Sequence, residues 1–169
     1  MTIDTQLPAS LETAVIKIGE MLISDSPGMT IVTYSLGSSI GITAYDPRLK
    51  LGGIVNYLLP EPMSREVERL HPMVFGKIAI PQFIDQLLGR GADPERLIVK
   101  LAGGAVMNGL NQILRIGQRN RELARTIFRS YGIAITAESD TSSPARSLKL
   151  DIQSGITTVE YPIESEVTL

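Results

Sequence analysis

Ser39 is the residue best placed to act as a nucleophile. It follows Leu36-Gly37-Ser38, a glycine-containing turn at the mouth of a strand-like segment, and such a turn can display a side chain. A serine hydroxyl is a poor nucleophile while protonated, so it needs a base. The next strand-like segment brings Asn56, whose carboxamide takes no proton near neutral pH. The residues therefore indicate the layout of an active site, but without a strong nucleophile or a general base.

The one histidine, His71, is the alternative source of a base. It lies in a charged, proline-bounded segment, 61–72, that we expect to be a loop, either covering a cleft or simply connecting two elements. A general base must be held within hydrogen-bond reach, which favours a solvated loop histidine over one that activates Ser39. The turn also lacks the G-x-S-x-G frame of a nucleophile elbow, and no phosphate-binding glycine motif is present.

Composition excludes several classes of function. The 169 residues suffice for one domain with a core, and 43% are hydrophobic and 20% charged. A net charge of −2 provides no footprint for nucleic acid. No cysteine is available for disulfides or thiolate ligands, and a single histidine argues against a histidine-based metal site, so we expect no metal and no cofactor. No apolar run spans a bilayer and no signal peptide is apparent, which predicts a cytoplasmic protein without membrane insertion.

Patterns of apolar residues predict the elements that position these side chains. Residues 118–131 carry one apolar stripe and form the clearest helix; a second helix over 78–88 is expected to start near Ile80, because Pro81 is tolerated only in a first turn. Short alternating or β-branched runs predict strands at 13–24, 30–34, 40–46, 53–59, 97–101, 133–137, 147–152 and 156–161.

Turn signals suggest how these strands connect. The turn at 25–28 suggests that the first two runs form a hairpin, and the turn at 153–155 predicts a second hairpin. Together, these elements predict a single-domain α/β (α+β) sandwich with a mixed sheet of about seven or more strands and two long helices. We expect a flexible N-terminus (1–12), one domain (13–162) and an acidic tail (163–169).

Four arginines accompany the clearest helix: Arg119, Arg121, Arg125 and Arg129. They could form a binding patch. Glu122 interrupts them and the net charge is low, so a solvated face is the favoured interpretation.

The chain resembles the CheD family, the chemoreceptor glutamine deamidases of bacterial chemotaxis, from about Val15 to Val159. The resemblance rests on the order and spacing of short motifs: Leu36-Gly37-Ser38, Tyr45-Asp46-Pro47, Gly52-Gly53, Leu59-Pro60, Gly103-Gly104-Ala105, Met107, Ile116-Gly117, Arg119-Asn120, Ala137-Glu138 and Ala145-Arg146. It implies an α/β sandwich in which a cysteine attacks a receptor glutamine side chain, a histidine activates the cysteine and a threonine orients the histidine. It also implies two partners, methyl-accepting chemoreceptors and CheC-type phosphatases.

Carried over by position, the family's cysteine falls on Ser39, its histidine on Asn56 and its threonine on Thr33, which is retained. Thr141-Ser142-Ser143 replaces a Gly-Gly pair that is usual in the family. The resemblance places partner binding near Gly37, Ser38, Gly103 and Gly104. The favoured hypothesis is a domain that binds a family partner without turning it over. The alternatives are a glutaminase that uses Ser39, an engineered cysteine-to-serine form of an active enzyme, and a chemotaxis adaptor or decoy.

Overall fold

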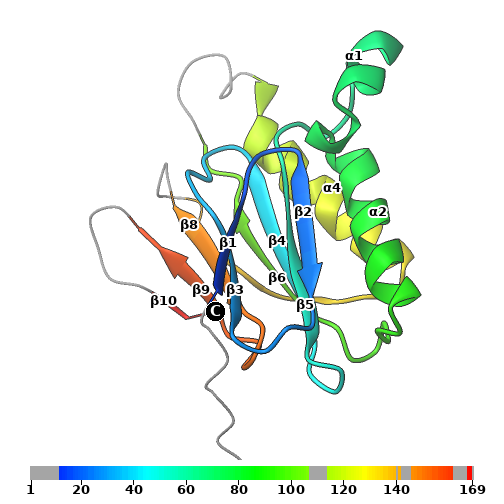
Figure 1. Ribbon diagram of the computed structural model, residues 1–169. Coiled ribbons are helices and arrows are strands. Elements are labelled where there is room, and N and C mark those ends of the chain that lie inside the picture. The colour runs from blue at the N-terminus through cyan, green and yellow to red at the C-terminus, as the bar shows by residue number, and fades with distance from the viewer. Residues whose placement is uncertain (1–11, 107–113, 140, 142–145, 162–166, 169) are drawn as a thin grey trace, which may run out of the picture.

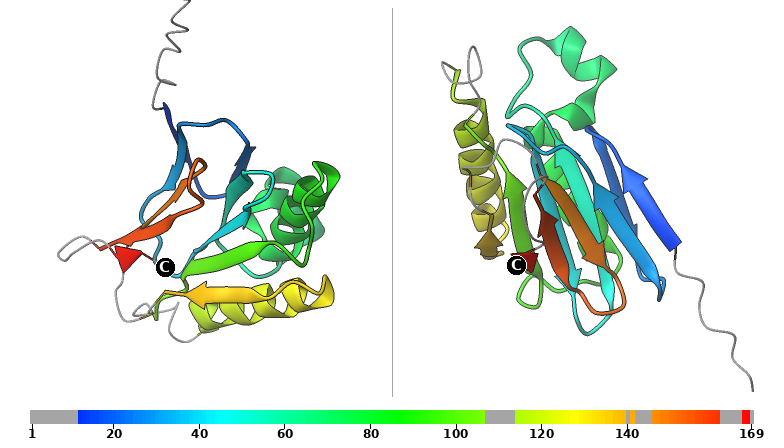
Figure 2. Two further views of the ribbon diagram at one scale, coloured as in Figure 1. Left: turned by 90° about the horizontal axis from the view of Figure 1, so that it is seen from below. Right: turned by 90° about the vertical axis from the view of Figure 1, so that its left-hand side faces the viewer.

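Two five-stranded sheets pack face to face, and helices cover the outer face of one of them (Figures 1 and 2). The computed structural model describes residues 12–106, 114–139, 141, 146–161 and 167–168. Sheet A has the strand order β1-β3-β8-β9-β10, and sheet B has the order β2-β5-β4-β6-β7. Both parallel and antiparallel pairs occur in each sheet. This arrangement confirms the predicted α/β sandwich with two long helices.

The elements have the following bounds. Sheet A contains β1 (Glu12–Ile16), β3 (Met29–Thr33), β8 (Ser147–Asp151), β9 (Thr157–Glu160) and β10 (Val167–Thr168). Sheet B contains β2 (Glu20–Ser24), β5 (Leu51–Tyr57), β4 (Ile40–Asp46), β6 (Ile98–Gly103) and β7 (Ile135–Glu138). The helical segments are α1 (Arg65–Leu70), the short 3-10 helix η1 (Pro72–Val74), α2 (Gly76–Gly89) and α4 (Ile116–Ser130). None of these helices is long and apolar enough to cross a membrane.

Strands β4 and β5 form the centre of the molecule, and every residue in both is buried. One face of sheet B packs on α2 and α4 through side chains such as Ile42, Val55 and Phe83. The other face packs on sheet A through a second cluster that includes Ile54 and Leu148. A strand covered on both faces has no solvent side, which is why most residues of these two strands are apolar or glycine.

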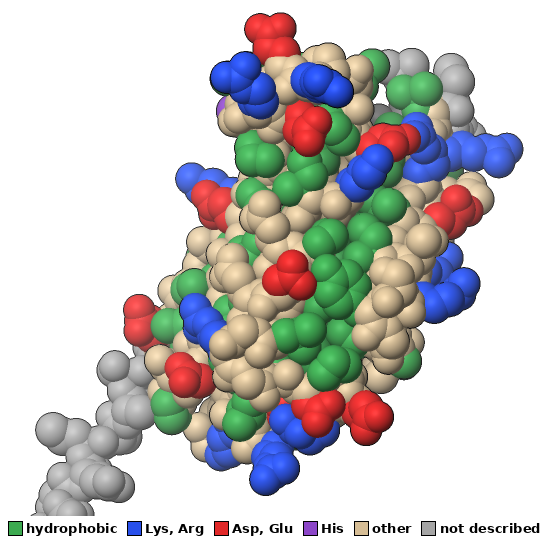
Figure 3. Space-filling view, turned by 90° about the vertical axis from the view of Figure 1, so that its right-hand side faces the viewer, with side chains coloured by type: hydrophobic (Ala, Val, Ile, Leu, Met, Phe, Trp, Pro, Cys, Tyr) green, Lys and Arg blue, Asp and Glu red, His purple; other side chains and the backbone are tan. Residues whose placement is uncertain are grey.

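The outer helical face is shown in Figure 3, where hydrophobic side chains form a band down the molecule and α1, at the top, carries charges of both signs. Leu88 of α2, and Ile127 and Tyr131 at the end of α4, remain half-buried beside the core. Gly132 follows α4 with a φ of 71°, as a glycine at a helix C-terminus commonly does.

The predicted hairpin over the first strands is wrong. β1 pairs in parallel with β3 in sheet A, whereas β2 pairs with β5 in sheet B. Gly19, at a φ of 79°, turns the chain from one sheet to the other, and its N–H donates to the carbonyl of Asn56 at 2.8 Å. The turn at 25–28 therefore also crosses between the sheets and does not close a two-stranded ribbon. The second predicted hairpin, β8–β9, is confirmed.

The predicted loop at 61–72 contains the helix α1, whose first turn is capped by the side chain of Ser64. Helix α2 begins four residues before Ile80, so Pro81 lies inside it and the expected start was wrong. Tertiary contacts extend the helix: the N–H of Gly76 donates to Leu59 O at 2.8 Å, and that of Lys77 to Pro60 O at 3.0 Å.

Both predicted terminal segments lie mostly outside the described residues. Of the N-terminal segment only Glu12 is described, and it opens β1. Of the C-terminal segment Val167 and Thr168 are described, and they pair with β9. Thr141 is described, whereas the neighbouring Ser142 and Ser143 lie outside the described residues.

Candidate functional site

Thr33 and Asn56 meet between the two sheets. Thr33 ends β3 in sheet A, and Asn56 lies near the end of β5 in sheet B. The Asn56 Nδ2 group donates a hydrogen bond of 2.7 Å to the Thr33 hydroxyl, and both residues are buried. The Asn56 Oδ1 atom is buried and has no hydrogen-bond partner among the described residues. The contact joins two of the three positions onto which the family resemblance carries the catalytic residues.

Ser39 lies at the same end of the sheets. It directly precedes β4, and Gly41, two residues further on, is paired with Asn56. Ser39 is only 3% exposed. Within the part of the chain that the structure describes, the Asn56 carboxamide bonds only Thr33 and makes no hydrogen bond to Ser39. The structure thus brings Thr33 and Asn56 into contact and places Ser39 nearby without coupling it to either.

The three consecutive carbonyls of Gly37, Ser38 and Ser39 all accept hydrogen bonds; we call this segment the Ser39 loop. The Ala105 N–H donates to Gly37 O at 2.9 Å, and the Gly104 N–H donates to Ser39 O at 2.9 Å. The Asn120 Nδ2 group donates to Ser38 O at 3.0 Å. Because every carbonyl of the Ser39 loop accepts a hydrogen bond, the shape of the loop depends on the two residues that follow β6 and on Asn120 of α4.

Gly103 and Gly104 wrap closely around the Ser39 loop. Both have positive φ, 98° and 71°, which favours glycine. A β-carbon on Gly103 would lie 2.1 Å from Ser39 O, and one on Gly104 would lie 2.8 Å from Arg121 Nε. Gly117 of α4 approaches from the other side, where a β-carbon would lie 2.5 Å from Gly104 O. These glycines are required for packing around the Ser39 loop.

Asn120 connects the Ser39 loop to the helix layer. It is fully buried, and its Nδ2 group also donates to Leu58 O at 2.8 Å, just after β5. The Tyr57 hydroxyl donates to the Asn120 carbonyl at 2.7 Å. Burial raises the pKa of Tyr57, which keeps the hydroxyl neutral and able to donate. The motif residues Gly103-Gly104-Ala105, Gly117 and Asn120 therefore converge on one loop.

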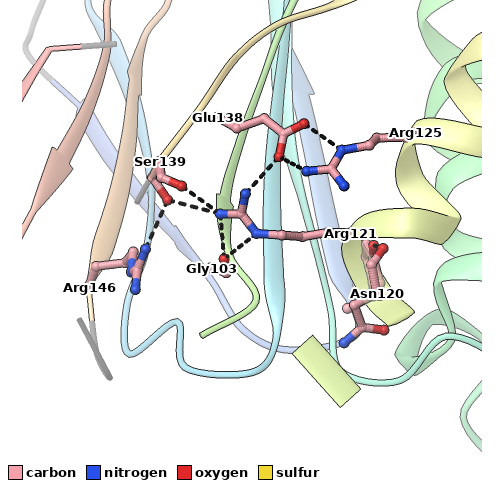
Figure 4. Close-up of polar contacts among 8 residues, drawn as sticks. Gly103, Asn120, Arg121, Arg125, Glu138, Ser139 and Arg146 are labelled. Atoms are coloured by element: carbon pink, nitrogen blue, oxygen red, sulfur yellow. Dashed lines mark hydrogen bonds and ion pairs between the residues drawn. The ribbon is translucent and has the colours of Figure 1, made fainter. Parts of the chain in front are cut away.

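Arg121 contradicts the predicted solvated face of α4. Its side chain is 8% exposed and bonds Gly103 O, Ser139 O and the Glu138 carboxylate (Figure 4). Sequence reasoning missed it because it stands among exposed arginines. A signal was present: Arg121 lies three and seven residues before Ala124 and Phe128, both on the buried face of α4.

Neither the candidate base His71 nor Glu20, the acidic residue paired with Asn56, is placed to serve Ser39. His71 is exposed at the junction of α1 and η1, where its backbone N–H bonds Val67 O. Glu20 is paired with Asn56 across β2 and β5, but β5 separates its strand from β4, and its carboxylate accepts from the Lys17 N–H at 2.8 Å.

Within the described residues, no group of three or more His, Cys, Asp or Glu could hold a metal ion.

Two packed sheets, a buried loop that leads from one to the other, and a helix layer that holds this loop define a single-domain α/β sandwich. The family model described as CheD chemotactic sensory transduction matches residues 58–161. This chain belongs to the CheD family of chemotaxis proteins. The family resemblance drawn from the sequence motifs is thereby confirmed.

Three relatives illustrate the similarity, and each is described as "Probable chemoreceptor glutamine deamidase CheD". The Solibacter usitatus protein is 34% identical over 146 residues, which cover 86% of this chain and 86% of that protein. The Desulforamulus reducens protein is 37% identical, covering 84% and 86%. The Thermococcus kodakarensis protein is 36% identical, covering 82% and 86%. Among solved structures, the hypothetical protein YfiH of Bacillus licheniformis matches 72% of this chain and 50% of its own, with a TM-score of 0.46 and 14% identity.

Proposed function

We propose that this chain binds the glutamine-bearing region of a methyl-accepting chemoreceptor without deamidating it. The relatives described above carry the description of chemoreceptor glutamine deamidases, which points to a chemoreceptor as the partner. The observation that carries the proposal is the buried Asn56–Thr33 hydrogen bond, which stands where an active site of this layout would need a base. The protein then acts as a regulatory binding module of the chemotaxis system.

Asn56 cannot accept the proton that a nucleophile must lose. A carboxamide donates and accepts hydrogen bonds, but it has no protonation equilibrium near neutral pH. Its Nδ2 group is already engaged with Thr33 at 2.7 Å. A histidine in such a position would exchange a proton with the nucleophile, with the threonine orienting its ring.

Ser39 increases the need for that missing base. A cysteine thiol has a pKa near ~8.5 and forms a thiolate readily, whereas a serine hydroxyl stays protonated without help. The loss of both members of a nucleophile–base unit typically costs on the order of 10⁶ in rate.

A site that has lost its catalytic side chains can still bind a glutamine side chain. The Asn56 Oδ1 atom is a buried acceptor without a partner among the described residues, and such an atom costs about 1–3 kcal/mol. A primary amide N–H, the group that ends a glutamine side chain, would satisfy it. The Ser39 loop and the Gly103-Gly104 turn would form the surrounding wall.

Exposed apolar side chains at the same end of the molecule provide a surface for a protein partner. Helix α1 has no buried residue, and it stands at the end of the sheets where β5 finishes (Figure 1). Met63, Val67 and Leu70 are 93%, 45% and 67% exposed. Val67 and Leu70, three residues apart in α1, lie on one side of the helix, and Met63 lies just before its N-cap, Ser64. An apolar strip of this kind suits a helical partner.

The test is a glutaminase assay of the purified protein on the cytoplasmic fragment of a chemoreceptor, alongside a binding measurement on the same fragment. The Desulforamulus reducens relative serves as the reference enzyme. We expect binding with no release of ammonia. Turnover within about a hundredfold of the reference, or a covalent ester on Ser39, would overturn the proposal, given the loss of rate expected.

A further inference from the structure

Arg121 is a buried side chain near the Ser39 loop whose guanidinium makes several hydrogen bonds. Its Nε and Nη2 atoms both donate to Gly103 O, at 3.0 and 2.8 Å. Nη2 also donates to Ser139 O at 2.7 Å, and Nη1 donates to a Glu138 carboxylate oxygen at 2.6 Å. Figure 4 shows the guanidinium lying between β6, β7 and the residue that follows β7. One side chain therefore joins two separate backbone segments, Gly103 at the end of β6 and Glu138–Ser139 at the end of β7.

The charge of Arg121 is matched within the same cluster. Burial lowers the pKa of Arg121, and the nearby Glu138 carboxylate opposes that effect. Arg125, one helical turn further on, donates to both oxygens of Glu138 at 2.8 and 2.7 Å, but its side chain is 46% exposed. Arg121 and Arg125 thus share one carboxylate, and of the two only Arg121 reaches Gly103.

The carbonyl that Arg121 holds lies directly against the Ser39 loop. Gly103 is so close that a β-carbon there would lie 2.1 Å from Ser39 O. The next residue, Gly104, donates its N–H to the same oxygen at 2.9 Å, and Ala105 donates to Gly37 O at 2.9 Å. A turn with two residues at positive φ has other accessible conformations when its carbonyl is released. The two Arg121 donors on Gly103 O favour the conformation in which the Gly104 and Ala105 N–H groups bond the Ser39 loop.

We propose that Arg121 is a positioning residue for the Ser39 loop: by holding the Gly103 carbonyl it fixes the Gly103–Ala105 turn, and that turn fixes the carbonyls of Gly37 and Ser39. The consequence for partner binding rests on the proposed function, whereas the structural coupling does not. Arg121 lies behind the turn and needs no contact with a ligand to exert this effect.

The test measures amide hydrogen exchange at individual residues in Arg121→Met and in a matched Arg125→Met variant. Both changes remove a bond to Glu138, but only Arg121→Met releases Gly103 O. We expect the Gly104 and Ala105 amides to exchange at least about tenfold faster in Arg121→Met, the effect of losing a charge-assisted hydrogen bond. Amides in the middle of β4, such as that of Ile42, should change much less, and Arg125→Met should leave Gly104 and Ala105 near their original rates.

A merely structural role for Arg121 would accelerate all slowly exchanging amides together. Equal acceleration at Ile42, or unchanged exchange at Gly104 and Ala105, would overturn the proposal. If Arg121→Met does not fold, Arg121→Lys replaces it: a lysine can reach one carbonyl but cannot bridge two carbonyls and a carboxylate. We then expect an intermediate exchange rate at Gly104, and wild-type exchange in Arg121→Lys would count against the proposal.

Binding to the chemoreceptor fragment separates this inference from the proposed function. We expect Arg121→Met to weaken binding and Arg125→Met to leave it nearly unchanged. If the unmodified protein does not bind the fragment, the proposed function fails, while the exchange result still decides the role of Arg121. If the exchange result is negative and the unmodified protein binds, only the role of Arg121 fails.

Discussion

The carbonyl oxygen of Ser39 lies where a β-carbon on Gly103 would come within 2.1 Å of it. Gly103→Ala should therefore destabilise the domain, because backbone must move and because a φ of 98° strains any residue with a side chain. We expect a loss of at least about 2 kcal/mol in the free energy of unfolding. Urea denaturation monitored by circular dichroism measures it.

Gly132→Ala is the matched control for that prediction. Gly132 also has a positive φ, 71°, but no atom lies within 4 Å of a β-carbon built there. It should show only the strain of the backbone, about 1 kcal/mol. Equal losses in the two variants would mean that the contact with Ser39 O does not limit position 103.

The double variant Ser39→Cys, Asn56→His should gain glutaminase activity that neither single variant has. A thiol supplies the nucleophile, and an imidazole beside Thr33 supplies the base. Position 56 is 1% exposed, so the larger ring should cost about 1–3 kcal/mol in stability. Ammonia release from a chemoreceptor fragment is the measurement. Full activity in Ser39→Cys alone would show that Asn56 is not what limits the chemistry.

Short glycine-containing motifs around Ser39 and Asn56 could be recognised in the sequence, and the fold brings these segments side by side. The sequence could not predict which of these motifs form hydrogen bonds with one another in the fold. Asn120 reads as an ordinary polar residue on a helix, yet it is fully buried and bonds Ser38 O and Leu58 O. Those contacts join segments 62 to 82 residues apart, and local patterns carry no information on such pairings.

Stability should fall as the pH drops below about 4, the ordinary pKa of a carboxyl group. Burial alone would raise the pKa of Asp46, but the hydrogen bond from Arg96 and three backbone N–H groups lower it below its usual value. The pKa of Glu138 is lowered chiefly by the hydrogen bond from Arg125. A carboxyl group whose pKa is depressed on folding stabilises the protein above its unfolded pKa, and this contribution is lost as the pH falls through the folded pKa.

Asp46→Asn isolates one part of that acid response. Asp46 is fully buried and bonds Arg96 Nη2 at 2.8 Å, so its neutral replacement should cost about 2 kcal/mol at pH 7. The difference between variant and unmodified protein should then shrink as the pH approaches 3. Urea denaturation between pH 3 and pH 7 follows both. A constant difference across this range would show that Asp46 does not ionise differently on folding.

Met63→Asp and Leu70→Asp should each weaken binding to a chemoreceptor fragment about tenfold or more, since a charge would enter an apolar contact. Both side chains are mostly exposed, at 93% and 67%, so the free energy of unfolding should barely change. Ile156→Asp is the control, at 50% exposure between β8 and β9. Isothermal titration calorimetry measures the affinity. Equal binding by all three variants would place the partner elsewhere.

The pattern-based expectations failed where tertiary contacts outweigh local preference. Pro81 predicted a helix start near Ile80, yet hydrogen bonds to Leu59 O and Pro60 O hold the earlier turn of α2 in place. The arginines of α4 predicted a solvated face, but one of them, Arg121, is drawn inward by two backbone carbonyls and a carboxylate. In both cases the deciding partners lie far away along the chain.

The division of β1 and β2 between the two sheets bears on how the chain assembles during synthesis. β1 depends on β3 for its pairing, and the other neighbour of β3 is β8, with Thr30 opposite Asp151. Sheet A therefore cannot close until β8 and β9, residues 147–160, have left the ribosome. Such distant pairings make for slow folding, and a nascent chain would expose the unpaired edge of β3 until β8 emerges.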